Sequence, residues 1–368
     1  MHRRPMLAAL LAAGVATGST LAGATAADAA TTTYTVTDLG TLGYISSSGG
    51  GLNAAGVVGG VSSLTATLPA NDCPPKYGVR KPCVVHPEHA FLYSGGVMTD
   101  LGTLGGTNSA ANAINATGTV AGSADLTDGA SHAIVESGGV ITDLGTLDGP
   151  AATSNALAIN NSGQIAGWST APNGAGDVAF ADLNGSMTDL GTIDGGTSSV
   201  ANGINATGVV IGNSDTASSD ERGFVYQNGT MTDVGTLGGP NSSVNAINDN
   251  GEVAGSAQDA SDASHPFVYS HGTMTSLGTY NIDTTPQAIN DNGVIVGTTY
   301  GVNAAGYPFT DAYIYQNGTF QDLNTLIPAG SGWQLTDAVA VNLGGDILVD
   351  ATNTTTGQDH AVLLTPTS

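Results

Sequence analysis

The strongest constraint on this chain is a sequence unit that recurs seven times along it. Three short signatures mark each copy: Thr-Asp-Leu-Gly-Thr-Leu or a variant, a run ending in Ile-Asn that leads into Gly-x-Val-x-Gly, and a segment resembling His-Ala-Phe-Val-Tyr. After the first interval the copies lie about 42 to 52 residues apart, in or near the range of four-stranded repeats. The Asn of the second signature recurs as Asn53, Asn115, Asn160, Asn205, Asn248, Asn290 and Asn342.

Each copy divides into four strand-length segments, a to d, with turn residues between them. Strand a is the run into Ile-Asn, such as Ala110 to Asn115, and strand b is the next segment, such as Gly251 to Gly255. Strand c is the aromatic segment, such as Phe224 to Tyr226, and the Asn-Gly hairpin signal that follows it leads to strand d. The consecutive apolar residues of strand c suit a strand that is buried on both faces between neighbouring units.

The order of strands at the two ends predicts a closed ring. Residues 34–42 read as a strand d without a, b or c before it, and residues 335–364 supply a, b and c without a d. The N-terminal strand would then complete the last blade, which removes exposed edges. We predict an all-β, seven-bladed β-propeller of four-stranded blades, closed by the N-terminal strand. An open β-solenoid and an array of separate units remain alternatives that the complementary ends disfavour.

Residues 1–29 read as a secretory signal peptide. Arg3 and Arg4 precede an apolar run over residues 6–15, and small residues follow up to Ala29, the order that signal peptidase recognises. We expect cleavage after Ala29, by the general secretory or the twin-arginine route, and a single mature domain over residues 30–368. No later stretch approaches the roughly 20 apolar residues of a membrane span. We therefore expect a secreted, extracellular protein.

The charge of the chain limits its partners. Six Lys and Arg stand against 30 Asp and Glu, a formal net charge of −24. Nucleic acids and anionic membranes are bound through clustered cations, so we expect neither as a partner. We expect a monomer that binds an extracellular polymer or protein ligand of unknown identity.

The three signatures read, in order along one part of the chain, His89-Ala90-Phe91, Thr99-Asp100-Leu101-Gly102-Thr103-Leu104-Gly105-Gly106 and Ala113-Ile114-Asn115. These strings resemble the HAF-repeat family of bacterial extracellular proteins, and the resemblance covers nearly all of the mature chain. It implies export and repetition, and it implies no shared activity. Three copies depart from the family pattern at the His position, with Val178, Arg222 and Asp311, which puts a common functional role of that His in doubt.

The lengths of the connections between strands indicate which face of a propeller would bind a ligand. The a–b and c–d turns would lie on one face, here called the a–b face, and the b–c and d–a connections on the other, the b–c face. The long b–c segments run over Val61–Glu88, Ser123–Ser131, Ser169–Asp177, Asn213–Glu221, Ser256–Ser264 and Thr298–Thr310. Because binding residues concentrate on variable loops held by a rigid scaffold, we predict a binding site on the b–c face.

The first of these connections, residues 61–88, is an insertion of exceptional length. Cys73 and Cys83 lie close together in it, and in an exported chain such a pair is expected to form a disulfide. The residues between the cysteines include the candidate binding residues Lys76, Tyr77, Arg80 and Lys81. One interpretation is that the bridge only holds a long loop and the cations offset an acidic body. The other is that this loop contacts an anionic partner or one that accepts an aromatic ring.

Other groups of polar residues are better explained by structure. His89, His132, His265 and His360 occupy one position of the repeat in different blades, so they are expected to cap the b–c connection. Calcium is the cofactor that an acidic exported protein would suit best, but no segment has the Asp-x-Asp-x-Asp-Gly spacing of a calcium loop. We therefore predict solvated acidic loops, no metal site and no cofactor. The acidic loop residues are Asp125, Asp128, Asp215, Asp220, Glu221, Asp259 and Asp262.

These features favour a secreted, non-catalytic propeller that binds a ligand, polymer or cell surface through its b–c face. An extracellular polysaccharide hydrolase or lyase is the first alternative, and it would need a pair of carboxylates in the central channel. A purely structural surface protein is the second. The chain has no Gly-x-Ser-x-Gly elbow, and no Ser, His and Asp set follows from spacing alone.

Overall fold

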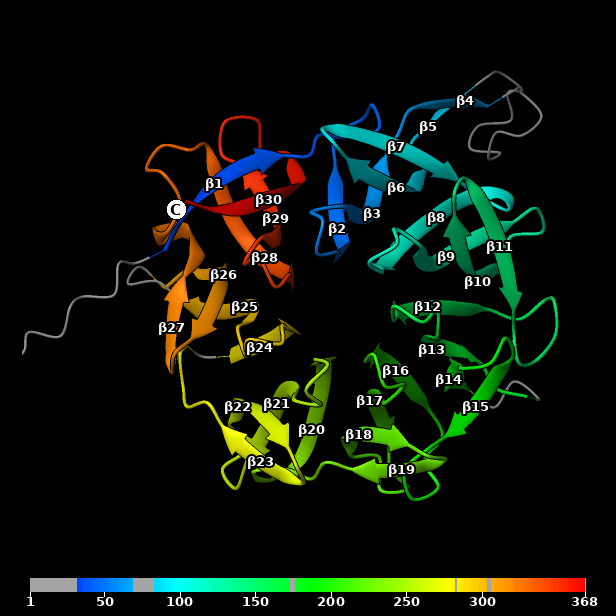
Figure 1. The fold of residues 1–368 in the computed structure, drawn as a ribbon, viewed down its shortest axis with the longest axis vertical. Helices are drawn as coiled ribbons and strands as arrows, with labels where there is room; N and C mark the ends of the chain where they lie inside the picture. The colour runs from blue at the N-terminus through cyan, green and yellow to red at the C-terminus, as the bar shows by residue number, and fades with distance from the viewer. Residues whose placement is uncertain (1–31, 69–82, 173–175, 282, 303–305, 368) are drawn as a thin grey trace, which may run out of the picture. The chain divides into compact units, whose positions relative to one another are not determined.

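The chain folds into a ring of blades (Figure 1). The computed structural model describes residues 32–68, 83–172, 176–281, 283–302 and 306–367. Over these residues it contains seven four-stranded antiparallel sheets, and in each the strands are hydrogen-bonded in the order a, b, c, d. The predicted seven-bladed β-propeller is confirmed. None of the helices over these residues is long and apolar enough to cross a membrane.

The blades are numbered 1 to 7 in chain order. Blade 1 comprises β2 Ser47–Leu52, β3 Val58–Ser63, β6 Glu88–Ser94 and β7 Val97–Gly102. Blade 2 comprises β8 Gly105–Ile114, β9 Val120–Leu126, β10 Ser131–Ser137 and β11 Val140–Gly145. Blade 3 comprises β12 Ser154–Ile159, β13 Ile165–Thr170, β14 Asp177–Asp182 and β15 Met187–Gly191. Blades 4 and 5 comprise β16 Ser199–Ile204, β17 Val210–Asp215, β18 Glu221–Gln227 and β19 Thr230–Asp233; and β20 Gly238–Ile247, β21 Val253–Asp259, β22 Ser264–Ser270 and β23 Thr273–Ser276. Blade 6 comprises β24 Asp283–Ile289, β25 Ile295–Val302, β26 Pro308–Gln316 and β27 Thr319–Asp322, and the 3-10 turn η1 Leu323–Thr325 follows it. Blade 7 comprises β28 Trp333–Val341, β29 Ile347–Asn353, β30 Asp359–Thr367 and β1 Thr33–Asp38.

Blade 7 is built from both ends of the described chain, as predicted. β1 pairs antiparallel with β30, from Thr33 opposite Thr367 to Asp38 opposite Val362. Asp38 also meets His360 across this pair, with 2.9 Å between Oδ1 and Nδ1. The strand that the sequence predicted to close the ring therefore does so by main-chain pairing and by a side-chain contact.

The recurring Asn of the second signature joins the blades at their inner edge. All seven of these residues are buried. In each, Nδ2 donates to the main-chain carbonyl of the equivalent Asn in the next blade, at 2.9–3.4 Å, and the bond from Asn342 to Asn53 completes the circle. In each, Oδ1 accepts from the backbone N–H four residues further on, which closes the a–b turn of its own blade. One side chain thus shapes a turn and links two blades.

The Gly of strand b and the aromatic residue of strand c fit together. Phe91 and Phe224 are fully buried. A Cβ added at Gly60 would lie 2.2 Å from the carbonyl oxygen of Ser48 and 2.7 Å from the Phe91 ring. At Gly212 the added Cβ would lie 2.7 Å from Cζ of Phe224. The strand-b signature therefore keeps a Gly because the ring of strand c and the backbone of strand a occupy the space of a side chain.

The recurring Asp of Thr-Asp-Leu-Gly ties strand d to strand c. Asp100 Oδ1 accepts from the backbone N–H of Gly102 at 2.7 Å and lies 2.9 Å from His89 Nδ1. His132 and Asp143 repeat the contact, and in blade 4 Arg222 takes the place of the His beside its Asp. His89, His132 and His360 thus have a structural role, but each contacts the Asp of strand d instead of capping the b–c connection. Each contact lies within its own blade, so these three histidines do not form one site.

Replacement of Gly60 by Ala is expected to lower the free energy of unfolding by about 3 kcal/mol or more, because the clashing carbonyl cannot rotate away. Urea unfolding followed by circular dichroism measures the change. Gly59→Ala is the matched control, since its Cβ would lie 3.4 Å from the side chain of Ala111 and blade 2 already has Ala121 at this position. Equal losses in the two variants would contradict the packing argument.

Asn160→Asp is expected to lower the free energy of unfolding by about 1–3 kcal/mol. The carboxylate can still accept from the N–H of Gln164, but it cannot donate to the carbonyl of Asn205. Asn228→Asp, at an exposed c–d turn, adds the same charge without touching the ring of Asn residues. If the two variants unfold at the same urea concentration, the donor to the next blade contributes nothing.

Candidate binding site

The predicted loop site falls largely outside the described residues. Cys73, Lys76, Tyr77, Arg80 and Lys81 lie in the undescribed residues 69–82. The backbone of Cys83 begins β5, Cys83–Val85, which pairs with β4, Ala66–Leu68, but its side chain is not described. The disulfide and the cationic contact therefore stay predictions.

The base of this insertion is anchored on the b–c face. The rings of Tyr44 and His86 stack with their centroids 3.5 Å apart and their planes 8° apart. Tyr44 lies in the connection that enters blade 1, and His86 directly follows β5. The insertion thus leaves the propeller from a base held by stacked rings.

Blade 5 departs from the His–Asp pattern because Ser276 stands in place of the Asp. His265 turns instead to Asp259, with 2.9 Å between Nε2 and Oδ2, and its Nδ1 lies 3.4 Å from the hydroxyl of Thr279. Hydrogen bonds from Ser261 and His265 hold the pKa of the Asp259 carboxyl well below its usual range. Thr279, His265 and Asp259 thus form a series of hydroxyl, imidazole and carboxylate, the order of groups in the catalytic triad of hydrolases. Spacing along the sequence did not show this grouping.

Blade 6 departs differently, because Asp311 occupies the His position and faces Asp322. Burial and the charge of Asp322 raise the pKa of the Asp311 carboxyl, while the amide of Gln334 donates to it at 2.6 Å. Asn324 also donates to Asp311 at 3.2 Å and to the carbonyl of Leu335 at 2.9 Å. The pair of carboxylates is thus tied into the joint between blades 6 and 7.

Two more carboxylates lie on the inner strands of blade 7. Asp337 and Asp350 are directly opposite each other in β28 and β29. Asp337 accepts from the hydroxyl of Thr298 in blade 6, and Asp350 accepts from the N–H of Gly49 in blade 1 at 2.8 Å. Burial raises the pKa of Asp350 to about 7. Asn213 makes the same contact from blade 4 to the N–H of Val244, at 2.8 Å. The position is therefore a joint between blades that an uncharged amide can serve.

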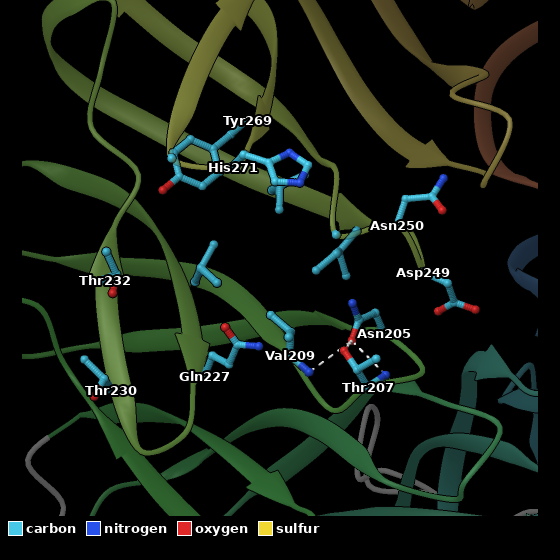
Figure 2. A pocket seen from close by; sticks show the side chains of 15 residues that line it. Asn205, Thr207, Val209, Gln227, Thr230, Thr232, Asp249, Asn250, Tyr269 and His271 are labelled. Atoms are coloured by element: carbon cyan, nitrogen blue, oxygen red, sulfur yellow. Dashed lines mark hydrogen bonds between the residues drawn. The ribbon is translucent and has the colours of Figure 1, made fainter.

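A groove of 580 Å³ opens on the a–b face between blades 4 and 5 (Figure 2). Gln227, Thr230 and Thr232 of blade 4 stand on one side, and Tyr269 and His271 of blade 5 face them. The described lining also includes Asn205, Thr207, Val209, Val225, Ile247, Asp249, Asn250, Gly251, Val253 and Gly272. The volume is in the range typical of ligand sites.

The polar groups on the walls of this groove are available to a ligand. Among the described residues, the Gln227 amide and the hydroxyls of Thr230 and Thr232 have no hydrogen-bond partner. His271 meets the Ser270 hydroxyl through Nδ1 at 2.8 Å, which leaves Nε2 free among these residues. Apolar side chains alternate with these groups, so the groove combines hydrogen-bonding walls with an apolar base.

His271 holds an unusual backbone conformation at the rim of the groove. Its φ is 51°, in the left-handed region, and Gly95, Gly138, Asn228 and Asn317 occupy the equivalent turn position of other blades. Gly adopts this region without strain, and His, like Asn and Asp, adopts it more often than most other residues. The turn therefore tolerates His271, which places an imidazole at the rim where the other blades have Gly or Asn.

The b–c face, on which the site was predicted, also has hollows. One of 470 Å³ lies over blade 4, and one of 270 Å³ lies mainly over blade 5 and reaches blades 4 and 6. Glu221 lines both. Each has less room than the groove on the a–b face, and the prediction of a b–c site is not tested by these shapes.

The sequence matches no protein-family model and no curated protein. Among solved structures, the β-propeller domain of the Trilobed protease from Pyrococcus furiosus is 9% identical with a TM-score of 0.44, covering 91% of this chain and 97% of that one. A Mycobacterium tuberculosis puromycin-hydrolyzing peptidase is 13% identical with a TM-score of 0.48, covering 86% and 52%. TolB from Acinetobacter baumannii is 14% identical with a TM-score of 0.42, covering 77% and 60%. The chain thus spans about half to three fifths of the last two proteins.

Asp350→Asn is expected to stabilise the propeller increasingly as the pH rises from 4 to 8. The folded pKa of about 7 lies above the ordinary value of 3.8, so the folded state binds the proton more tightly and loses stability as the pH rises through this window. The gain at pH 8 is at most about 4 kcal/mol, because Asn keeps the acceptor for Gly49 without the charge. Thermal unfolding from pH 4 to pH 8 measures it. A constant difference between variant and wild type would contradict the assignment.

Proposed function

We propose that this protein is an exported, non-catalytic β-propeller that binds its ligand in the groove between blades 4 and 5. The observation that carries the proposal is a groove of 580 Å³ whose walls present exposed amide and hydroxyl groups without a partner among the described residues, with His271 at the rim. Free donors and acceptors around a partly apolar hollow of ligand size favour binding.

Export is supported by the signal-like residues 1–29, which precede the described chain. The b–c face remains a second candidate, supported by the stacked Tyr44 and His86 that brace the base of the insertion. Enzymatic activity is the alternative that the Thr279, His265 and Asp259 grouping would support. One experiment distinguishes binding in the groove, binding on the b–c face and enzymatic activity.

Purified residues 30–368 are co-sedimented with bacterial cell wall and insoluble polysaccharides, and soluble sugars are measured in the supernatant. We expect wild type to bind, and His271→Gly and Gln227→Ala each to weaken binding at least tenfold. Because Gly adopts positive φ without strain, His271→Gly should fold as stably as wild type or more stably. Asn317→Gly, at the equivalent turn of blade 6, is the matched control and should bind normally.

A variant lacking residues 72–84 tests the predicted loop site in the same assay. Normal binding by this variant, with loss in the groove variants, supports the proposal. Loss with the loop deletion alone would move the site to the b–c face. Release of soluble sugars that stops in Thr279→Ala would replace the proposal with the enzyme.

A further inference from the structure

The groove between blades 4 and 5 continues to the axis of the ring. A second hollow, of 210 Å³, lies among the a–b turns at the axis. Asp249 lines both hollows, so they meet at this residue. The axial hollow is lined by small and amide residues of the turns and by large apolar residues at the ends of the a strands. The first group includes Ala54, Ala116, Asn161 and Ala206, and the second is Leu52, Ile114, Ile159 and Ile204. Together the two hollows form a radial track that runs from strand d of blade 4 to the axis.

The chemistry of the track is that of neutral hydrogen bonding. No Lys or Arg lines either hollow among the described residues, and Asp249 is the one carboxylate that does. Amides, hydroxyls and the imidazole of His271 supply the other polar groups, while Val209, Val225 and Val253 give an apolar base. A sugar ring has the matching pair of surfaces, because hydroxyl groups surround its edge and C–H groups cover its faces.

Asp249 is fixed at the junction. Its Oδ1 accepts from the N–H of Ala206 in blade 4 at 2.7 Å, and its own N–H donates to Oδ1 of Asp291 in blade 6 at 2.8 Å. Three consecutive blades thus hold the residue in place. The other carboxylate oxygen remains an acceptor for hydroxyl groups at the middle of the track.

We propose that the ligand is a linear, neutral oligosaccharide that lies along this track, with one end at the outer strand of blade 4 and the other in the axial hollow. The inference rests on the proposed function and specifies its ligand. A polyanion would meet no cation in the track and a formal net charge of −24 on the chain. A single sugar would fill only part of the combined space, so affinity is expected to rise with chain length.

Isothermal titration with cello-, malto- and manno-oligosaccharides of two to six units tests the proposal on residues 30–368. We expect one of the three series to bind, with affinity rising at least tenfold from dimer to hexamer. Ala116→Tyr fills the axial hollow from an exposed turn position and should lower affinity for the hexamer to that of the dimer. Asn184→Tyr places the same ring on a c–d turn of blade 3, away from the track, and should bind as wild type.

Oligogalacturonate and glucosamine oligomers are titrated as charged probes. Binding of either in preference to all three neutral series, or no binding of any neutral series, would overturn the neutral ligand. Equal affinity for dimer and hexamer, or a normal length dependence in Ala116→Tyr, would overturn the radial track. In each case, cell-wall binding that still depends on Gln227 and His271 would leave the proposed function standing.

Discussion

The amide that reaches from each a–b turn to the carbonyl of the next blade is the contact on which the ring depends. Asn suits it because the side chain is short enough to close its own turn through Oδ1 and still carries a donor on Nδ2. Asp lacks that donor. Each of these carbonyls also accepts from the backbone N–H three residues further on in its own turn, so the amide of the neighbouring blade adds a second bond to it. The bond from Asn342 to Asn53 is of the same kind as the others, so the seam that joins the ends of the chain is not a special joint.

Much of this architecture could be predicted from the sequence. A repeat with four strand-length segments, and complementary strands at its ends, specified the blades and the closure by β1, since both depend on local patterns and on the need to pair every strand edge. The sequence placed the recurring Asn at the end of strand a. Its bond to the next blade was not foreseen, because no pattern within one repeat shows which atoms of the next repeat lie beside it.

The groove was missed for a related reason. Loop length favoured a site at the b–c connections. The groove instead forms where two blades meet and is lined by short turns and by strand d. One signal was present in the sequence. His271 stands where other copies have Gly or Asn, and this exchange marks the c–d turn of blade 5 as a departure from the repeat. The predicted residues Lys76, Tyr77, Arg80 and Lys81 stood out because they lie between two cysteines in the longest b–c connection and because cations are rare in this chain.

The acceptor at every joint of the Asn ring is a main-chain carbonyl, which every residue type provides. This bond therefore makes no demand on the side-chain type of the neighbouring blade. Sequence drift in one blade leaves the Asn bonds to its neighbours intact, even where the apolar and polar side chains between two blades change. A repetitive protein can in this way acquire a specialised cleft, such as the one between blades 4 and 5, without losing the bonds that close its ring.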